Sequence, residues 1–332
     1  MRFRFSIVGF VFTVAPFAHG EVIYVSSLGT HGVLRYDDAT GAFIDEFISA
    51  GSGGLNQPHG ILERCDDILV ASFGTDSVLR YDRATGSFID VFISAATGLD
   101  NPVYMRYGPD GRIYISSQGS DEVLRYSFDG TFVDAFVTAG SGGLDGPSGF
   151  AFGPDGRLYV AGRFSANVIA YDAATGAFDE VIADATFGLG AGTTFGLNFG
   201  DNGDLYFASA GSVFRYDLDT TSILSTTPLG SAIGIEPGST GDIFVATGNN
   251  LRIIDTATGA VSGLFLSGGS ISTLNFFRFP SPAPAPGCTP IPAVSTWGVA
   301  MLALGLLILG TVSLKSTAAA NREVLKGNWV AG

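Results

Sequence analysis

Residues 29–48 read GTHGVLRYDDATGAFIDEFI, and residues 74–93 repeat them as GTDSVLRYDRATGSFIDVFI. A third copy, GSDEVLRYSFDGTFVDAFV, occupies residues 119–137. A short apolar run precedes each copy, and six such runs are centred on residues 23, 68, 113, 158, 205 and 243. Repeats of about 45 residues that are built of strand-like runs are typical of β-propeller blades.

The apolar runs have the composition of β-strands, because Val, Ile, Phe and Tyr dominate them. Turn motifs separate them: Gly-Pro-Asp-Gly at residues 108–111 and 153–156, and Ala-Thr-Gly at residues 39–41, 84–86, 174–176 and 257–259. In the second repeat we predict strands at residues 60–64, 68–72, 77–82 and 87–93. The sequence therefore predicts an all-β fold over residues 21–280, a six-bladed β-propeller with four antiparallel strands per blade.

The two ends of the repeat array complement each other. The first repeat begins at Val22 and lacks an innermost strand, whereas an unassigned strand-like segment remains at residues 272–279. We expect this segment to pair with residues 22–27, so that three N-terminal strands and one C-terminal strand form the closing blade. Such closure removes the exposed sheet edges that an open array would leave.

Outside the propeller, both termini have the composition of export and membrane signals. Residues 1–20 combine a basic start, an apolar stretch and small residues, which is the pattern of a secretory signal peptide. Residues 281–290 are a Pro-rich linker. Residues 291–332 follow, and the uncharged stretch at 293–314 is long enough to form a single transmembrane helix before a short basic tail.

The start of this last segment resembles the IPTL-CTERM sorting domain, a bacterial C-terminal signal. The shared residues are Ile291, Pro292, Ser295, Trp297 and Gly298, while positions 293, 294 and 296 differ from the family pattern. An ordinary membrane anchor is the alternative. The resemblance implies a bacterial protein of the cell envelope or surface. On either reading the propeller faces outward, and it is tethered unless the segment is cleaved.

The charge balance argues against nucleic-acid binding. The chain has 17 Lys and Arg against 31 Asp and Glu, a net charge of −14, and such a surface repels phosphate backbones. Two cysteines are present: Cys65 after the first strand of the second blade, and Cys288 in the linker. A disulfide between them is possible in an exported protein.

The repeats resemble NHL-type propellers, most closely in GPDGRLYV at residues 153–160 and NQPHGI at residues 56–61. The sixth repeat is also similar to YVTN surface propellers, in IFVAT (243–247) and DTATG (255–259). Proteins with these folds range from binding scaffolds to enzymes, so the resemblance leaves the activity open.

The segments that enter the innermost strands should meet at the channel mouth and form a polar rim. They include residues 56–59, 100–103, 145–148 and 193–194. Asp100, Asn101 and Asp145 belong to this rim and could offer oxygen ligands to Ca²⁺ or Mg²⁺. These residue types are also common turn formers.

Streptogramin lyases and gluconolactonase-like enzymes are similar propellers with a divalent metal at the channel mouth. The lyase-like match Pro58-His59-Gly60 suggests His59 as a catalytic base. A lone histidine at the start of a strand can equally be structural.

We therefore expect a monomeric extracellular binding or interaction module whose ligand is a glycan, a protein or a small molecule. The alternative is a metal-dependent lactonase or lyase with its site at the channel mouth. A purely structural surface protein is the third possibility.

Overall fold

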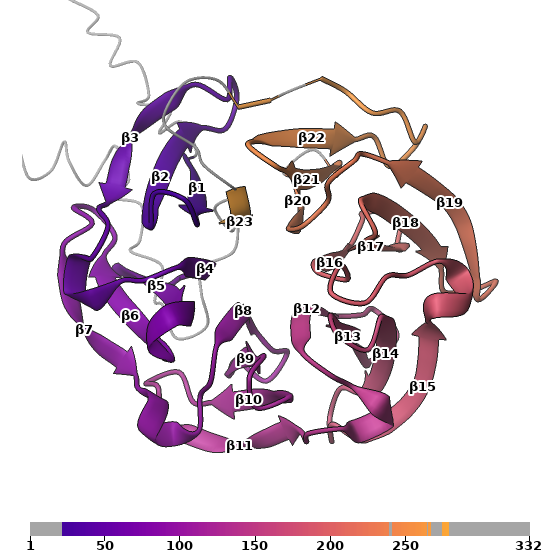
Figure 1. Cartoon of the computed structure of the whole chain (residues 1–332), viewed down its shortest axis with the longest axis horizontal. Helices are drawn as coiled ribbons and strands as arrows, with labels where there is room; N and C mark the ends of the chain where they lie inside the picture. The colour runs from indigo at the N-terminus through magenta and orange to yellow at the C-terminus, as the bar shows by residue number, and fades with distance from the viewer. Residues whose placement is uncertain (1–21, 239–240, 264, 267–273, 279–332) are drawn as a thin grey trace, which may run out of the picture. The chain divides into compact units, whose positions relative to one another are not determined.

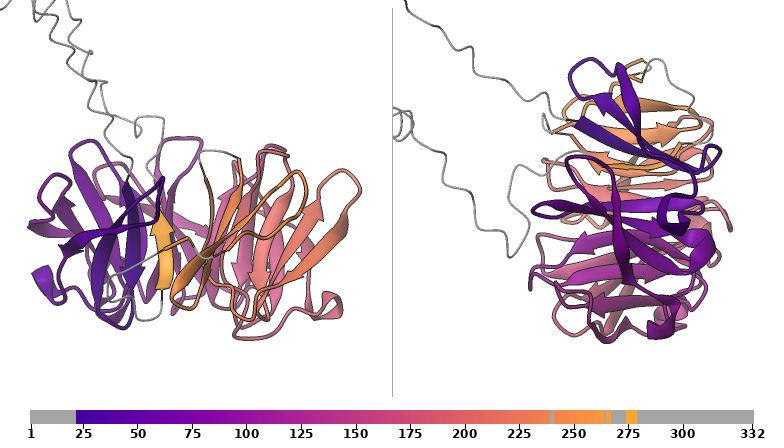
Figure 2. Two further views of the ribbon diagram at one scale, coloured as in Figure 1. Left: turned by 90° about the horizontal axis from the view of Figure 1, so that it is seen from above. Right: turned by 90° about the vertical axis from the view of Figure 1, so that its left-hand side faces the viewer.

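A computed structural model of the chain describes residues 22–238, 241–263, 265–266 and 274–278. These residues form six β-sheets around a central channel, in chain order around the ring (Figure 1). Figure 2 shows the same sheets from two directions across the channel axis. The six-bladed β-propeller expected from the repeat is thus confirmed.

Each of the first three blades has four antiparallel strands, in order from the channel outward. The first blade consists of β23 (Leu274–Arg278), β1 (Val22–Ser27), β2 (Gly32–Asp37) and β3 (Phe43–Ile48). The second consists of β4 (Pro58–Glu63), β5 (Asp67–Ser72), β6 (Ser77–Asp82) and β7 (Phe88–Ile93). The third consists of β8 (Pro102–Tyr107), β9 (Ile113–Ser117), β10 (Glu122–Tyr126) and β11 (Phe132–Val137).

The remaining blades follow the same order until the sixth. The fourth consists of β12 (Pro147–Phe152), β13 (Arg157–Gly162), β14 (Asn167–Asp172) and β15 (Phe178–Ala183). The fifth consists of β16 (Leu197–Phe199), β17 (Leu205–Ser209), β18 (Ser212–Asp217) and β19 (Ser222–Pro228). The sixth consists of β20 (Ile235–Pro237), β21 (Ile243–Thr247) and β22 (Asn250–Ile254).

The prediction of four strands per blade is wrong for the sixth blade as far as the structure describes it. Its sheet has three strands, and a single antiparallel bridge from Ile254 to Val261 stands where the outer strand would be. In the aligned segment, AVSGLFL at residues 260–266, Ser262 and Gly263 stand where the first repeat has Ile44 and Asp45, and glycine within a strand weakens it.

Short 3-10 helices occur in the loops. Four of them follow an outer strand, where the chain turns back toward the channel: η1 (Ser52–Gly54), η3 (Ala95–Thr97), η4 (Ser141–Gly143) and η5 (Ala185–Phe187). The fifth, η2 (Phe73–Thr75), lies in the turn between β5 and β6.

The closing blade is built as the sequence predicts. Strand β1 pairs antiparallel with β23 on one side and with β2 on the other. Tyr24 lies opposite Arg278, and Ser27 lies opposite Leu274. The three-plus-one closure is therefore confirmed.

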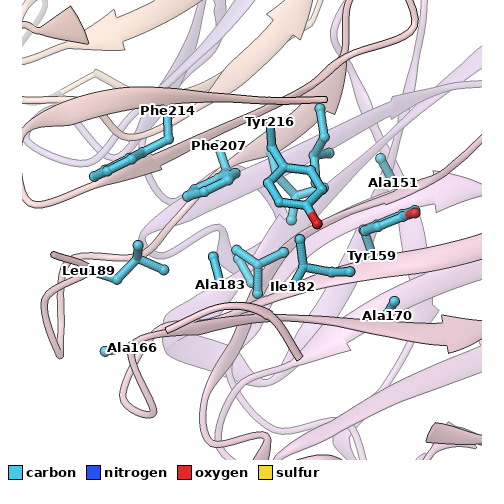
Figure 3. Close-up of a cluster of buried hydrophobic side chains, with 14 residues drawn as sticks. Ala151, Tyr159, Ala166, Ala170, Ile182, Ala183, Leu189, Phe207, Phe214 and Tyr216 are labelled. Atoms are coloured by element: carbon cyan, nitrogen blue, oxygen red, sulfur yellow. The ribbon is translucent and has the colours of Figure 1, made fainter. Parts of the chain in front are cut away.

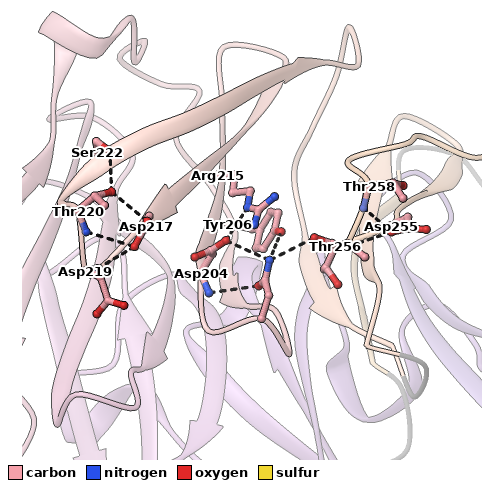
Figure 4. Close-up of polar contacts among 12 residues, drawn as sticks. Asp204, Tyr206, Arg215, Asp217, Asp219, Thr220, Ser222, Asp255, Thr256 and Thr258 are labelled. Atoms are coloured by element: carbon pink, nitrogen blue, oxygen red, sulfur yellow. Dashed lines mark hydrogen bonds and ion pairs between the residues drawn. The ribbon is translucent and has the colours of Figure 1, made fainter.

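A side-chain turn recurs between the two outer strands of most blades. In the first blade Asp37 Oδ1 accepts hydrogen bonds from the backbone N and the hydroxyl of Thr40, at 2.8 and 2.6 Å. The chain then turns at Gly41, which has a φ of 68°. The Asp–Thr pair recurs at Asp217 and Thr220 and at Asp255 and Thr258 (Figure 4). Asp and Thr at this spacing thus form the turn that follows the third strand of the blade.

The core lies between neighbouring blades. In the first four blades, the third strand buries one tyrosine completely, and these are Tyr36, Tyr81, Tyr126 and Tyr171. Between the fourth and fifth blades, Tyr159, Phe207 and Ile182 belong to one core cluster (Figure 3). The arginine beside three of the third-strand tyrosines pairs with an aspartate of the outer strand, as Arg35 does with Asp45. These repeated arginines therefore have a structural role.

Candidate binding site at the channel mouth

One end of the channel contains a cavity of about 170 Å³. Its walls come from all six blades, and the lining residues are Leu28, His59, Val103, Gln118, Ser148, Arg163, Phe195 and Ile233. Half of these side chains are apolar, and one carries a charge at neutral pH. The cavity therefore combines an apolar wall with a small set of polar groups, which is the usual composition of a ligand site.

The lining residues occupy two repeated positions of the blade. His59, Val103 and Ser148 are the second residues of β4, β8 and β12, and Phe195 and Ile233 lie two residues before β16 and β20. Leu28, Gln118 and Arg163 each directly follow the second strand of a blade, namely β1, β9 and β13. The repeat thus places equivalent positions around one cavity, and the differences among the repeats determine its chemistry.

The innermost strands of neighbouring blades pack closely at glycine residues next to the cavity positions. A Cβ atom on Gly149 would lie 2.7 Å from Gly196 Cα, and one on Gly196 would lie 2.5 Å from the Ile233 carbonyl oxygen. Only glycine permits this approach. The third blade has Tyr104 at the equivalent position, and its ring packs edge-on against Phe150 with the ring centres 5.5 Å apart.

Arg163 is the cationic group of the cavity. Its Nε donates to the Gly192 carbonyl at 3.3 Å, and its Nη1 donates to Gln118 Oε1 at 3.2 Å. Its guanidinium carbon lies 4.9 Å from the centre of the Phe195 ring. Among the described residues no carboxylate pairs with it, and burial lowers the pKa of the guanidinium below its ordinary value. Arg163 is thus a half-buried cation whose charge no described carboxylate balances, and charged side chains that leave the surface are usually paired.

Two polar groups of the cavity have no hydrogen-bond partner among the described residues. They are the amide nitrogen Nε2 of Gln118 and the hydroxyl of Ser148. Gln118 is 5% exposed and Ser148 is fully buried. Because Gln118 Oε1 accepts from Arg163, its Nε2 is left as a donor. A buried donor without a partner destabilises the folded state by about 1–3 kcal/mol. A ligand that accepts these hydrogen bonds would remove that destabilisation.

His59 lies in the cavity wall as a neutral ring. Its imidazole stacks on Phe73 with the ring centres 4.6 Å apart. Nδ1 lies 3.0 Å from the Gln57 carbonyl oxygen, which can only accept, so Nδ1 carries the proton. Burial, with a smaller contribution from the charge of Arg163, lowers the pKa of His59 to about 4, against the hydrogen bond to Gln57. A general base works best with a pKa near the operating pH, so this ring is poorly tuned for that role.

The predicted metal ligands lie in the loops that lead into the innermost strands. Asp100 and Asp145 are exposed and occupy equivalent positions of neighbouring blades, 45 residues apart. Asn101 has a φ of 50°, and its side-chain nitrogen donates to the Phe73 carbonyl at 3.1 Å. None of the three lines the cavity.

In the described part of the chain, no group of three His, Cys, Asp or Glu side chains could hold a metal ion together. Binding of Ca²⁺ or Mg²⁺ by Asp100, Asn101 and Asp145 therefore stays a prediction.

A second polar group crosses the channel further along the same strands. Glu236 of β20 accepts hydrogen bonds from the Tyr104 hydroxyl, from Arg106 Nη2 at 2.9 Å and from Asn198 Nδ2 at 3.3 Å. Strands β8 and β20 face each other across the ring (Figure 1). Although burial opposes its charge, Glu236 and Tyr104 raise the pKa of Arg106 above its ordinary value. This channel network of Tyr104, Arg106, Asn198 and Glu236 is internally paired.

The sequence predicts one of the four polar residues of the cavity as a functional side chain, His59. It places Ser148 only within the polar rim and misses Gln118 and Arg163. The signal for Arg163 is its position: aligned by the 45-residue interval, residues 28, 73, 118 and 163 are Leu, Phe, Gln and Arg. A basic residue at a position that is apolar in the first repeats marks a departure from blade packing.

Cys65, between β4 and β5, is disulfide-bonded. Cys288 lies outside the described residues, so the pairing of the two stays a prediction. The signal peptide at 1–20, the linker at 281–290 and the sorting or transmembrane segment at 291–332 also lie outside them. In the part of the chain that the structure describes, no helix has the length and apolarity needed to cross a membrane.

No family model and no curated protein matches the sequence. The fold is nevertheless shared with solved structures. A nidogen–laminin complex contains a chain with a TM-score of 0.63 and 15% identity over 78% of this chain and 97% of that one. Virginiamycin B lyase from Staphylococcus aureus gives a TM-score of 0.53 and 13% identity over 74% and 80% of the two chains.

A third similar structure is the extracellular domain assigned to a one-component system of B. thetaiotaomicron. It has a TM-score of 0.52 and 20% identity over 78% of this chain, which spans 36% of that one. At these identities the likeness shows the fold alone. The chain is thus a six-bladed β-propeller of the general kind found in extracellular proteins and in lyases.

Proposed function

We propose that the protein is an exported, membrane-tethered propeller that binds an extracellular ligand in the cavity at the channel mouth. One observation carries this proposal: beside the half-buried Arg163, the cavity has two buried polar groups without a partner among the described residues, Gln118 Nε2 and the Ser148 hydroxyl. Folded proteins satisfy nearly all buried donors, so unsatisfied ones around a cavity favour a missing ligand.

Export is supported by the signal-peptide pattern of residues 1–20 and by the disulfide bond of Cys65, because disulfides persist in oxidising compartments. Tethering is supported by the apolar segment at 293–314. Membrane flotation of the expressed chain, with and without residues 291–332, tests this part of the proposal.

The binding role is tested with a ligand screen and a variant that fills the cavity. Ile233→Trp places a large ring in the cavity wall, where Ile233 is partly exposed. Leu224→Trp is the matched control, because Leu224 lies on outer strand β19 and is 49% exposed. The purified full chain and both variants are screened against glycans, peptides and small metabolites.

We expect the cavity ligands to bind the wild-type chain and the Leu224→Trp variant but not the Ile233→Trp variant. Circular dichroism and thermal melting establish that both variants fold. If every ligand in the screen binds all three proteins equally, the cavity is not the binding site and the proposal fails.

A metal-dependent lactonase or lyase is the second candidate, favoured by the position of His59 in the cavity wall. Mass-spectrometric metal analysis of the full chain, purified without chelator, tests it against an Asp100→Ala, Asp145→Ala variant. Stoichiometric Ca²⁺ or Mg²⁺ that the variant loses, together with lactone or lyase turnover that His59→Ala abolishes, would favour the enzyme over the binding module.

A further inference from the structure

We infer that the cavity at the channel mouth recognises a small organic carboxylate, with Arg163, Gln118 and Ser148 holding the carboxylate and the apolar wall holding the rest of the ligand. This inference rests on the proposed binding function and names the ligand class. It follows from three features of the cavity: its charge, its unpaired donors and its apolar lining.

The charge comes from a single guanidinium. Arginine has five N–H donors in a planar fork, and two of those of Arg163 donate to Gly192 and Gln118. Its Nη2 makes no hydrogen bond to a described residue. The planar guanidinium thus has N–H groups that are not used within the described protein, and their geometry matches the two oxygens of a carboxylate.

The neighbouring donors extend this site. Gln118 Nε2 and the Ser148 hydroxyl are buried and unpartnered among the described residues, and both residues line the cavity with Arg163. Gln118 is also held in place by Arg163, since its Oε1 accepts from Nη1. An anion that receives hydrogen bonds from these three groups would satisfy each of them, whereas a cation or a ligand with only donors would leave them unpaired.

The net charge of the whole protein limits how many negative charges the ligand can carry. With a net charge of −14, the surface repels multiply charged ligands, and one guanidinium balances one negative charge. A monocarboxylate therefore fits better than a phosphate or a polyphosphate.

The size and apolar walls of the cavity describe the rest of the ligand. The lining includes Leu28, Val103, Phe195 and Ile233. The volume of about 170 Å³ is near that of an apolar cavity of about 150 Å³ known to hold benzene. The ligand, or the part of it that enters, is thus about the size of one small ring or a short branched chain.

Benzoate and benzamide form a matched pair of probes for this test. They have nearly the same shape, but only benzoate carries a negative charge. Each is titrated into the purified full chain by isothermal titration calorimetry, with inorganic phosphate as a third probe. We expect benzoate to bind in the millimolar range or tighter, and benzamide and phosphate to bind about tenfold more weakly or not at all.

Three variants locate the site. Arg163→Gln should weaken benzoate binding by about tenfold or more, because it removes a charge-assisted hydrogen bond. Ser148→Ala should weaken it by a smaller factor and is expected to fold, since it deletes an unpartnered hydroxyl. Arg112→Gln is the control: Arg112 is exposed and, among the described residues, its side chain pairs with Asp110 alone, so benzoate should bind this variant as it binds the wild type.

The outcomes separate this inference from the proposed function. Equal binding of benzoate and benzamide, or benzoate binding that neither Arg163→Gln nor Ser148→Ala weakens, overturns the carboxylate inference, and so does failure of benzoate to bind. Preferential phosphate binding overturns it as well. The binding function itself fails only if the Ile233→Trp substitution weakens the binding of no ligand in the screen. A neutral ligand that Ile233→Trp excludes would leave that function standing without the carboxylate.

Discussion

The propeller channel contains two polar clusters that differ in how their charges are paired. In the channel network, Arg106 lies against Glu236, and Tyr104 and Asn198 complete the hydrogen bonds. In the cavity, Arg163 has no carboxylate among the described residues, and two neighbouring side chains retain unpartnered groups there. Strand β8 contributes to both, with Val103 in the cavity wall and Tyr104 and Arg106 in the channel network. A paired cluster of this kind stabilises the ring, whereas the groups of an unpaired cluster can still form hydrogen bonds and an ion pair with a ligand.

The largest effect is expected from breaking the paired cluster. Glu236→Ala removes the anion opposite Arg106 and leaves a buried, uncompensated charge, so the free energy of unfolding should fall by about 3–5 kcal/mol. Urea denaturation measures this. Glu46→Ala, at an exposed position of β3, should change the same quantity by less than about 0.5 kcal/mol. Equal effects of the two substitutions would contradict the assigned role of Glu236.

The next largest effect is a pH dependence of the free energy of unfolding that arises from His59 in the cavity wall. Because burial lowers the pKa of His59 from 6.5 to about 4, the unfolded chain takes up a proton before the folded one does. The free energy of unfolding therefore keeps its full value above pH 6.5. It falls by up to about 3 kcal/mol as the pH drops to 4, because only the unfolded chain gains the proton in this range. Denaturation curves across this range should show the loss in the wild type.

His59→Val is the matched variant for this measurement, since Val103 occupies the same position of the third blade. Its stability should fall less over the same pH range. The turn carboxylates with lowered pKa, such as Asp37 and Asp82, are present in both proteins and titrate below their ordinary 3.8. Parallel pH profiles for wild type and variant would contradict the assignment to His59.

A smaller loss is expected when one hydrogen bond of the channel network is removed. Tyr104→Phe deletes the hydroxyl that donates to Glu236 and accepts from Arg106, and should lower the free energy of unfolding by about 1–3 kcal/mol. Tyr216→Phe is the control, because Tyr216 is equally buried in aromatic core and its hydroxyl makes no hydrogen bond to a described residue. The control should be closer to the wild type in thermal and urea denaturation.

The smallest effect, with the opposite sign, is expected in the cavity. Ser148→Ala removes a buried hydroxyl without a partner among the described residues, so the free energy of unfolding should stay constant or rise by about 1 kcal/mol. Ser116→Ala gives the contrast, since the Ser116 hydroxyl accepts from the Tyr104 backbone N at 2.9 Å and its loss should destabilise. If Ser148→Ala destabilises as much as Ser116→Ala does, its hydroxyl has a structural partner and the cavity is not built for a ligand.

The fold could be predicted from the sequence because several copies of the repeat carry the same evidence for it. Each copy carries the same turn residues and the same strand pattern, and the missing strand at one end matches the surplus strand at the other. The prediction for the second blade, residues 60–64 to 87–93, lies within two residues of the observed strands at every boundary. The sixth blade departs because Ser262 and Gly263 interrupt the strand pattern of its outer segment.

The site is harder to predict because it consists of what the repeats do not share. A local resemblance points to His59, but its stacking on Phe73 and its lowered pKa depend on tertiary packing. Asp100, Asn101 and Asp145 have the right types for a metal, yet Asn101 uses its side chain to hold a turn. Recognising Arg163 requires a comparison of single positions across blades, and no local pattern surrounds it.

The closing blade also determines how the ring responds to a pulling force. Tyr24 near the start of β1 lies opposite Arg278 at the end of β23, so the two chain ends leave the sheet at the same end of this strand pair. A tether attached beyond Arg278 and pulled against the N-terminal side would open the pair like a zipper, breaking the hydrogen bonds in succession from Tyr24 toward Ser27, rather than sliding the strands along each other. The seam that completes the ring is therefore also the place where mechanical load would open it first.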